Sequence, residues 1–298
     1  VPDPIPGEGE VPLKIEASGM CASDLHAYRA PAGSGTRMPI GHEPCGVVEE
    51  LGPNVDAQKT PVGMRTIQHH YRGCGSCDQC SGGWTQLCRN GYIGYGYDAP
   101  GSHAQYMAVP ASTLVPLPDS ITFTAGAAMA CGTGTAFQAL QRLEVKEGEV
   151  LIIYGLGPVG LSATQFGFSM GARVIGVDLT EKRRRHAKSM GADITLDPEA
   201  NDPVEQVWEL TSGRGAECGL DASGNAEARA QMVRSLGTWG RGCFVGEGGN
   251  VQLNISDDLL RRQFTLHGSW TFSTSVVADY ARYARKTKSI RTHQWSLD

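Results

Sequence analysis

Four cysteines lie close together in the sequence, at a spacing that suits a bound metal better than free thiols. They are Cys74, Cys77, Cys80 and Cys88, in the pattern C-x2-C-x2-C-x7-C. Thiolates on such short loops can converge tetrahedrally on Zn²⁺, and four protein ligands leave no open position, which is typical of a structural site. An iron–sulfur cluster or a nucleic-acid-binding zinc ribbon uses similar ligands, but the acidic balance of the chain and the dinucleotide-binding pattern described next disfavour both.

A glycine-rich segment follows an apolar run and is expected to open a helix. The apolar run covers residues 150–154, and the segment after it contains Gly155, Gly157, Pro158, Val159 and Gly160. In a strand–turn–helix context the first glycine permits a tight turn, the second lets backbone approach a pyrophosphate, and the third packs helix against strand. The diphosphate then lies at the N-terminus of the helix. The pattern therefore predicts a dinucleotide site rather than a plain tight turn.

Asp178 ends the next apolar run and bears on which dinucleotide is bound. A carboxylate there accepts hydrogen bonds from the adenosine ribose hydroxyls and repels a 2′-phosphate, which favours NAD over NADP. The nearby Arg183, Arg184 and Arg185 could neutralise such a phosphate. Because the repulsion by Asp178 would remain, we predict NAD.

Two regions with different sequence patterns indicate the elements that position these residues. Up to about Pro118 the sequence is rich in Gly and Pro, with short β-like runs at 11–15 and 45–51, which predicts an irregular, mostly β region. From Glu149 onward, strand, glycine turn and helix alternate, which predicts a doubly wound parallel sheet and an α/β fold. The six candidate strands are residues 150–154, 173–177, 193–195, 217–220, 241–245 and 265–267.

Length and charge exclude several classes of protein. A chain of 298 residues predicts two domains at about 150 residues each. The net charge of −5 offers no positive surface for nucleic acid or an anionic membrane. Apolar runs are shorter than the roughly 18 residues that a membrane helix needs, and VPDPIPGEGE at the start does not resemble a secretory signal. We expect a cytoplasmic protein with no nucleic-acid or membrane partner.

Three further segments contain residue types that could bind a second metal ion. Cys21 lies in the segment GMCASDLH, His42 and Glu43 follow Gly41, and Cys131 lies in the segment MACGTGT. Taken singly, such a cysteine is usually a small core residue and such a histidine a satisfied polar one. In this order, together with the thiol cluster and the glycine-rich segment, they resemble the zinc-dependent medium-chain alcohol dehydrogenase family over essentially the whole chain.

The resemblance implies a domain organisation. A mostly β, GroES-like zinc catalytic domain is expected over residues 1–125, completed by 269–298, and a Rossmann dinucleotide-binding domain over 126–268. Zinc and nicotinamide meet between the two domains in the family. Members normally begin a strand or two before the position of Val1 and continue past that of Asp298 with a further helix and strand.

The resemblance also implies roles for individual residues of the catalytic domain. Cys21, His42 and Cys131 correspond to the catalytic zinc ligands, and such a Cys2His set leaves one position open for water or substrate oxygen. The carboxylate Glu43 lies beside the metal in the family. Ser23 matches a hydroxyl that hydrogen-bonds the alcohol, His26 an imidazole that passes the proton to solvent, and Asp24 the carboxylate that orients the histidine ligand.

Other positions match family contacts to cofactor and substrate. Thr135 corresponds to a residue that packs on the nicotinamide, Arg183 to one near the adenosine ribose, and Val245 to one whose backbone faces the carboxamide. Alignment on Cys74 brings His70 towards the substrate channel, and Trp270 falls near the domain junction. A hydrogen-bonded surface position for His69 and His70, and core packing for Trp270, are equally consistent with the sequence.

We expect a zinc-dependent oxidoreductase that transfers a hydride between an alcohol and NAD, with two zinc ions per chain and a homodimeric or homotetrameric assembly. Polyol and threonine members often have glutamate in place of Cys131, which favours a small alcohol or its carbonyl product as the substrate pair. The alternatives are a polyol or amino-alcohol dehydrogenase of the same family and a non-catalytic relative that binds NAD and zinc.

Overall fold

The structure is a computed structural model that describes residues 2–29, 31, 38–276 and 279. Contacts divide the chain into two compact units: the residues up to Gly134 together with the described residues from Phe272 onward, and Thr135–Thr271. The domain limits expected from the sequence remain a prediction, and residues 280–298 of the expected closing segment lie outside the described residues.

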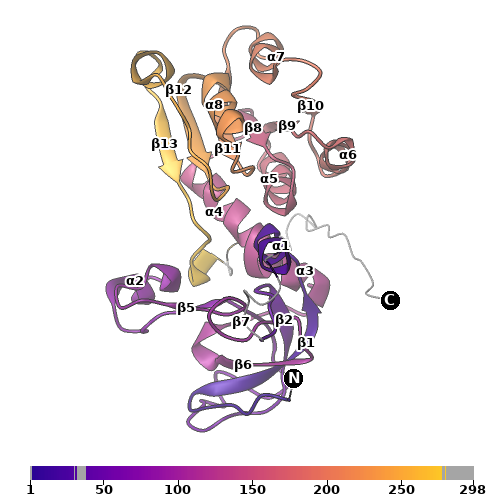
Figure 1. The fold of residues 1–298 in the computed structure, drawn as a ribbon, viewed down its shortest axis with the longest axis vertical. Helices are drawn as coiled ribbons and strands as arrows, with labels where there is room; N and C mark the ends of the chain where they lie inside the picture. Colours follow the sequence, from indigo (N-terminus) through magenta and orange to yellow (C-terminus); the bar gives the residue numbers. More distant parts are fainter. Residues whose placement is uncertain (1, 30, 32–37, 277–278, 280–298) are drawn as a thin grey trace. The chain divides into compact units, whose positions relative to one another are not determined.

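The first unit is built on a five-stranded antiparallel sheet in the order β6-β1-β2-β3-β7 (Figure 1). Its strands are β1 (Glu10–Ser18), β2 (Pro44–Val48), β3 (Arg65–Gln68), β6 (Tyr106–Pro110) and β7 (Leu114–Pro116). The alternating side chains Val11 and Leu13 of β1 are fully buried with Met107 and Val109 of β6, as expected where one face of a sheet covers a core. The predicted mostly β region is confirmed. The run at 45–51 enters the sheet only to Val48.

Short helices and a two-stranded ribbon carry the chemistry-bearing segments of this unit. They are α1 (Ala22–Tyr28), α2 (Asp78–Ser81), α3 (Phe123–Ala128), the 3-10 turns Thr85–Leu87 and Ala111–Thr113, and the ribbon β4 (Tyr71–Arg72) with β5 (Ile93–Gly94). Thr122 caps α3 by accepting a hydrogen bond from the backbone N–H of Ala125 at 3.2 Å. A π-helical turn, Met129–Thr133, follows α3 and leads into α4 (Gly134–Arg142).

The second unit is a six-stranded, all-parallel sheet in the order β10-β9-β8-β11-β12-β13 (Figure 1). The strands are β8 (Val150–Tyr154), β9 (Arg173–Val177), β10 (Ile194–Leu196), β11 (Ala216–Asp221), β12 (Leu236–Phe244) and β13 (Thr265–Gly268). The helices are α5 (Pro158–Ser169), α6 (Glu181–Ser189), α7 (Pro203–Leu210) and α8 (Ala226–Ser235), with short π and 3-10 turns at Ile255–Leu259 and Leu260–Arg262. The predicted doubly wound α/β fold is confirmed.

Strand β12 is the element whose start the sequence misplaced. It begins at Leu236 rather than at 241 because the glycine-rich stretch that reads as a turn is accommodated inside the strand. Trp239 has a positive φ of 63°, and the pairing of β11 with β12 shifts register between Ala216 and Cys218. Such an irregularity is a β-bulge, which local glycine content does not distinguish from a loop.

The helices of the described residues are short. The longest, α5, has 12 residues, and among all described segments no helix is long and apolar enough to cross a membrane. The helices of the second unit pack against its parallel sheet, whose central strand β8 is buried throughout. Tyr154 of β8 lies in that core, where its hydroxyl is 3.0 Å from the hydroxyl of Ser235.

Candidate metal centres and dinucleotide site

The loop from residue 73 to residue 88 brings the four clustered thiols together. Their sulfur atoms all lie within 4.8 Å of one another, and Cys77 Sγ is 3.9 Å from Cys88 Sγ. Sulfur atoms about 2.3 Å from a tetrahedral Zn²⁺ would be about 3.8 Å apart. A Cβ on Gly73 would lie 2.4 Å from Cys80 Sγ, so the loop closes this tightly only because residue 73 has no side chain. The donor set fits a closed zinc site.

Local donors favour the thiolate form of Cys74 and Cys77, whereas burial raises the pKa of Cys80 to about 12. The hydroxyl of Ser76, together with backbone N–H groups, lowers the pKa of Cys74 to about 5. The backbone N–H of Cys74 in turn donates to Cys88 Sγ at 3.3 Å. Because the thiolate is the form that binds metal, these hydrogen bonds prepare the loop for a cation.

A second set of ligand atoms converges from three distant segments of the same unit. The set consists of Cys21, His42, Glu43 and Cys131, whose ligand atoms lie within 4.8 Å of one another. Cys21 is the N-cap of α1, His42 and Glu43 immediately precede β2, and Cys131 lies in the π-helical turn. π-Helical turns are rare and often occur at functional sites. The residues that the family resemblance singled out are therefore neighbours in space.

Asp24 holds two of these ligands in place. Its Oδ1 is 3.0 Å from His42 Nδ1, and its Oδ2 accepts a hydrogen bond from the backbone N–H of Cys21 at 2.7 Å. Asp24 and His42 are 3% and 1% exposed, so water does not compete for these bonds. Because Nδ1 is engaged by Asp24, Nε2 is the histidine nitrogen available to a metal.

The electrostatics of the set favour a bound cation. Hydrogen bonds from Cys131, His42 and Ser23 lower the pKa of Cys21 to about 3, although burial opposes this shift. Burial alone would lower the pKa of His42, but its contacts with Asp24 and Cys21 raise it to about 10. Burial and the negative charge of Cys21 raise the pKa of Glu43 to about 8. Several acidic groups thus crowd one buried site, and a divalent cation would relieve their repulsion.

Gly19 lets the backbone approach Glu43. Its N–H donates to the carbonyl of Glu43 at 3.1 Å, and a Cβ on Gly19 would lie 1.8 Å from Glu43 Oε2. The ring of His103 approaches from another side, with Nε2 3.2 Å from the Gly19 carbonyl. His103 thus borders the segment beside the candidate catalytic metal set.

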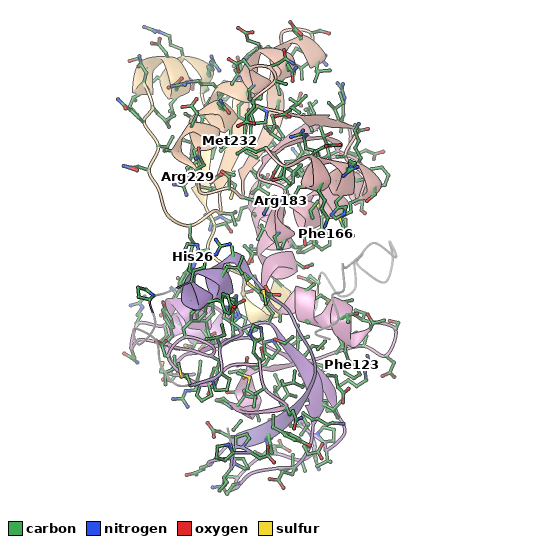
Figure 2. All side chains as sticks on the ribbon, turned by 45° about the vertical axis from the view of Figure 1, so that its right-hand side comes forward. His26, Phe123, Phe166, Arg183, Arg229 and Met232 are labelled. Carbon is green, nitrogen blue, oxygen red and sulfur yellow. The ribbon has the colours of Figure 1, made fainter. Side chains whose placement is uncertain are left out.

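Ser23 and His26 both lie on α1, but their surroundings differ. Ser23 Oγ accepts a hydrogen bond from the hydroxyl of Tyr97 at 3.0 Å. His26 is exposed (Figure 2), and no hydrogen bond joins it to Ser23 in the described part of the chain. Sequence reasoning did not identify Tyr97, because its contact with Ser23 joins positions that are 74 residues apart in the chain.

The positions of His69, His70 and Trp270 correct part of the sequence interpretation. A surface position for the two histidines is wrong, since each is only 1% exposed. His69 Nε2 lies 3.1 Å from the carbonyl of Phe272, and the ring of His70 packs edge-on against His42 at 5.0 Å. Core packing for Trp270 is also wrong: it is 36% exposed, and its Nε1 donates to Glu247 Oε1 at 2.5 Å.

Each glycine of the dinucleotide loop has the geometry that its predicted role requires. Gly155 has φ +90°, and a Cβ on Gly160 would lie 1.9 Å from the carbonyl oxygen of Gly155. A Cβ on Gly157 would meet nothing within 4 Å, so the space before the N-terminus of α5 is open to a ligand. Pro158 and Val159 begin that helix, and its first free N–H groups, which proline itself lacks, can bind an anion.

Asp178 follows β9 beside this loop. Its Oδ2 accepts a hydrogen bond from the backbone N–H of Leu156 at 2.8 Å, and its Oδ1 one from Thr180 at 2.8 Å. Arg183 Nη1 is 3.5 Å from Asp178 Oδ2 and remains half-exposed. Arg184 is held by Asp197 at 2.7 Å, and Arg185 pairs with Glu181 at 3.8 Å. Arg183 is therefore the arginine of the three whose guanidinium pairs with Asp178.

A buried ion pair organises the loops after β11 and β12. Asp221 Oδ2 accepts a hydrogen bond from Arg229 Nε at 3.0 Å, and Arg229 of α8 also donates to the carbonyl of Gly246. The backbone N–H of Val245 donates to the Asp221 carbonyl at 2.9 Å. Val245, a predicted cofactor contact, therefore lies at the carboxyl edge of the parallel sheet, where such folds bind dinucleotides. Thr135, the other predicted nicotinamide contact, is buried in α4.

Known sequences related to this chain are zinc-type dehydrogenases. Residues 7–119 match the family described as Alcohol dehydrogenase GroES-like domain, and residues 158–287 the family described as Zinc-binding dehydrogenase. The chain is 34% identical over 312 residues to the uncharacterized zinc-type alcohol dehydrogenase-like protein YphC of Escherichia coli K12, covering 99% of this chain and 87% of that protein. It is 29% identical over 307 residues to a sorbitol dehydrogenase of Halalkalibacterium halodurans, covering 99% and 88%.

A solved structure shares the whole fold. It is described as a putative zinc-binding dehydrogenase from Sinorhizobium meliloti 1021 bound to NADP, with 28% sequence identity and a TM-score of 0.87. The alignment covers 98% of this chain and 85% of that chain. The similarity thus extends over both units.

Proposed function

Because the chain belongs to the zinc-binding medium-chain alcohol dehydrogenase family, we propose that it oxidises a small alcohol, or reduces its aldehyde or ketone, with NAD as the hydride carrier. The observation that carries the proposal is the convergence of Cys21, His42, Glu43 and Cys131 within 4.8 Å. Three sulfur or nitrogen ligands with one open position form a recognised catalytic zinc arrangement.

Zinc and the nicotinamide would supply one part of the chemistry, and side chains of the protein the other part. Zinc supplies a Lewis acid that lowers the pKa of the alcohol, and the nicotinamide supplies the hydride acceptor. Ser23 accepts the proton of the substrate hydroxyl, and His26 releases a proton to solvent. Asp24 keeps His42 oriented, and the loop containing Gly157 receives the pyrophosphate at the N-terminus of α5.

The preference for NAD over NADP rests on Asp178. Its carboxylate lies beside the dinucleotide loop, hydrogen-bonded to the backbone of Leu156, where it would disfavour a 2′-phosphate. The NADP-bound relative shows that this fold also accepts NADP. In this chain the pairing of Arg183 with Asp178 supports NAD, since it engages the guanidinium that would otherwise attract a phosphate.

The alternative substrates are polyols and amino alcohols. One relative is a sorbitol dehydrogenase, so a polyol is a candidate substrate. The cysteine at position 131 instead favours a simple alcohol as the substrate. A non-catalytic relative that binds NAD and zinc is the third possibility. It is disfavoured by the presence of the full set of ligands and of both predicted relay residues, Ser23 and His26.

A substrate screen tests the proposal. Zinc-loaded protein is assayed by NADH absorbance with primary, secondary and aromatic alcohols, polyols and amino alcohols, using NAD and NADP separately. Cys131→Ala should abolish turnover. Cys45→Ala, which removes a buried thiol of the same unit outside the metal set, should retain it. Zinc and NADH binding without turnover on any substrate would indicate the non-catalytic alternative.

The family also suggests an oligomeric assembly and a cellular compartment for this protein. We propose a homodimer or homotetramer in the cytoplasm, as in the family, with a small alcohol or carbonyl compound and the nucleotide as ligands. Sedimentation of the full chain measures the assembly directly, and a monomer at micromolar concentration would contradict it.

A further inference from the structure

The turn between β5 and β6 packs on the backbone that precedes His42. A Cβ on Gly96 would lie 2.6 Å from the carbonyl oxygen of Gly41, and a Cβ on Gly101 only 2.2 Å from that oxygen. The N–H of Gly101 donates to the carbonyl of Pro39 at 2.7 Å. Because positions 96 and 101 have no side chain, the turn can pack closely against the segment that carries His42, a candidate metal ligand.

This turn carries Tyr97 to the candidate catalytic site. The phenol ring lies 4.9 Å from the His42 ring, at 32° between planes, and its hydroxyl donates to Ser23 Oγ at 3.0 Å. Tyr97 is 40% exposed. Tyr97 therefore contacts both a candidate metal ligand and the hydroxyl that we propose accepts the substrate proton.

The hydrogen bonds around Ser23 have a direction. Tyr97 donates to the Ser23 oxygen at 3.0 Å. One lone pair of Ser23 is thus occupied from the side of Tyr97, and the Ser23 hydroxyl can still donate its own hydrogen. Serial hydrogen bonds of this kind polarise one another.

We propose that Tyr97 is a positioning residue of the dehydrogenase reaction: its phenol orients the Ser23 hydroxyl and stabilises the negative charge that develops on Ser23 as protons pass through it. The inference rests on the proposed function. In alcohol oxidation the substrate proton goes to Ser23 Oγ as the original Ser23 proton goes to His26 or water, while the hydride, with its electron pair, goes to NAD. Tyr97 keeps its own proton.

A double-mutant cycle tests this role. Tyr97→Phe keeps the ring and removes the hydroxyl, and it should lower kcat about three- to tenfold, as expected for one lost hydrogen bond, with little change in KM. In a Ser23→Ala background the same substitution should have no further effect, since the hydroxyl acts through Ser23. Zinc content and the Kd for NADH should match the wild type in all variants.

Tyr28→Phe serves as the matched control, because it removes a phenol of α1 that is 82% exposed, and it should leave kcat unchanged. A Tyr97→Phe enzyme with wild-type kcat would overturn the proposal. An equal fold loss with and without Ser23 would overturn it too, since it would show a general structural effect. Absence of alcohol turnover in the wild type would overturn the proposed function itself, and this inference with it.

Discussion

Asp24 is a buried carboxylate that links two residues of the candidate catalytic metal set. It bonds His42 through one oxygen and the backbone of Cys21 through the other, so the two ligands share one support. Burial raises the pKa of Asp24, but His42, the backbone N–H of Cys21 and His103 together lower it further, and the net shift is downward. A charged, nearly inaccessible carboxylate fixes the histidine tautomer, which a neutral or mobile group would leave undefined.

The proposed proton path gives a prediction about Ser23 and His26. Ser23→Ala should lower alcohol oxidation at every pH, because it removes the hydroxyl that we propose accepts the substrate proton. His26→Gln should cost about 10²-fold near neutral pH and recover in part at high pH, where hydroxide and buffer substitute for the base. Steady-state rates from acid to alkaline pH measure both. A His26→Gln enzyme equal to the wild type throughout, with zinc and NADH binding intact, would mean that the proton leaves by another route.

Asp178 gives a prediction about the cofactor. Asp178→Gly should weaken NADH binding about tenfold and improve NADPH binding, because Arg183 is released to attract a 2′-phosphate. Fluorescence titrations with NADH and NADPH measure both constants. Asp193→Gly is a suitable control, since that carboxylate also accepts a backbone hydrogen bond, from Val174 at 2.8 Å, but precedes β10. An unchanged preference in Asp178→Gly would show that Asp178 does not face the ribose.

At the scale of elements, the carboxyl ends of the parallel strands are joined by loop-to-loop contacts. A Cβ on Gly155 would lie 2.8 Å from the backbone nitrogen of Ser223, and one on Gly246 only 2.2 Å from that of Gly224. Asp221 bonds to Ser223 and Gly224 as well as to Arg229. The loops after β8, β11 and β12 therefore form one packed edge.

One ion pair of the second unit lies at this edge and another lies away from it. We therefore predict that the two pairs differ in their effect on cofactor binding. Arg229→Gln removes the pair with Asp221 at the carboxyl edge, and Arg241→Gln removes the 2.6 Å pair with Glu149, which lies just before β8. Both should lower thermal stability, by about 3–5 kcal/mol for the fully buried Arg229 pair. Arg229→Gln alone should also raise the Kd for NADH, roughly tenfold. Calorimetry and NADH titration separate the effects, and equal Kd values would refute a link between the ion pair and the cofactor.

At the scale of the molecule, both candidate metal sites belong to the first unit and the dinucleotide loop to the second. The two metal sites differ in what surrounds them. The thiol cluster lies on one loop and supplies four sulfur ligands, whereas the other set gathers residues from three segments around a buried carboxylate. A closed site and an open site should exchange their metal at different rates.

Metal removal tests that difference. About two zinc ions per chain are expected, and brief chelation should leave about one, held by the four thiols, because the other site has a position open to competing ligands. Activity should be lost with the first ion and return on adding Zn²⁺. Metal analysis with circular dichroism follows both events. Retention of both ions, or loss of both with the fold intact, would contradict the assignment.

The sequence alone determined the features that depend on near neighbours in the chain. The thiol spacing, the glycine-rich turn after residues 150–154 and the alternation of strands and helices could all be predicted, because each follows from local spacing and local backbone preference. The start of β12 could not, since its glycines sit in a bulge that only pairing with β11 stabilises.

Only the tertiary structure decided which polar residues meet. Cys21, His42 and Cys131 lie far apart in the chain, and the family resemblance, rather than any spacing rule, grouped them. The burial of His69 and His70 and the bond from Tyr97 to Ser23 had no local signal. The packing of the elements against one another determines which side chains are buried and which form long-range hydrogen bonds. The local sequence around a residue therefore does not identify its distant partners.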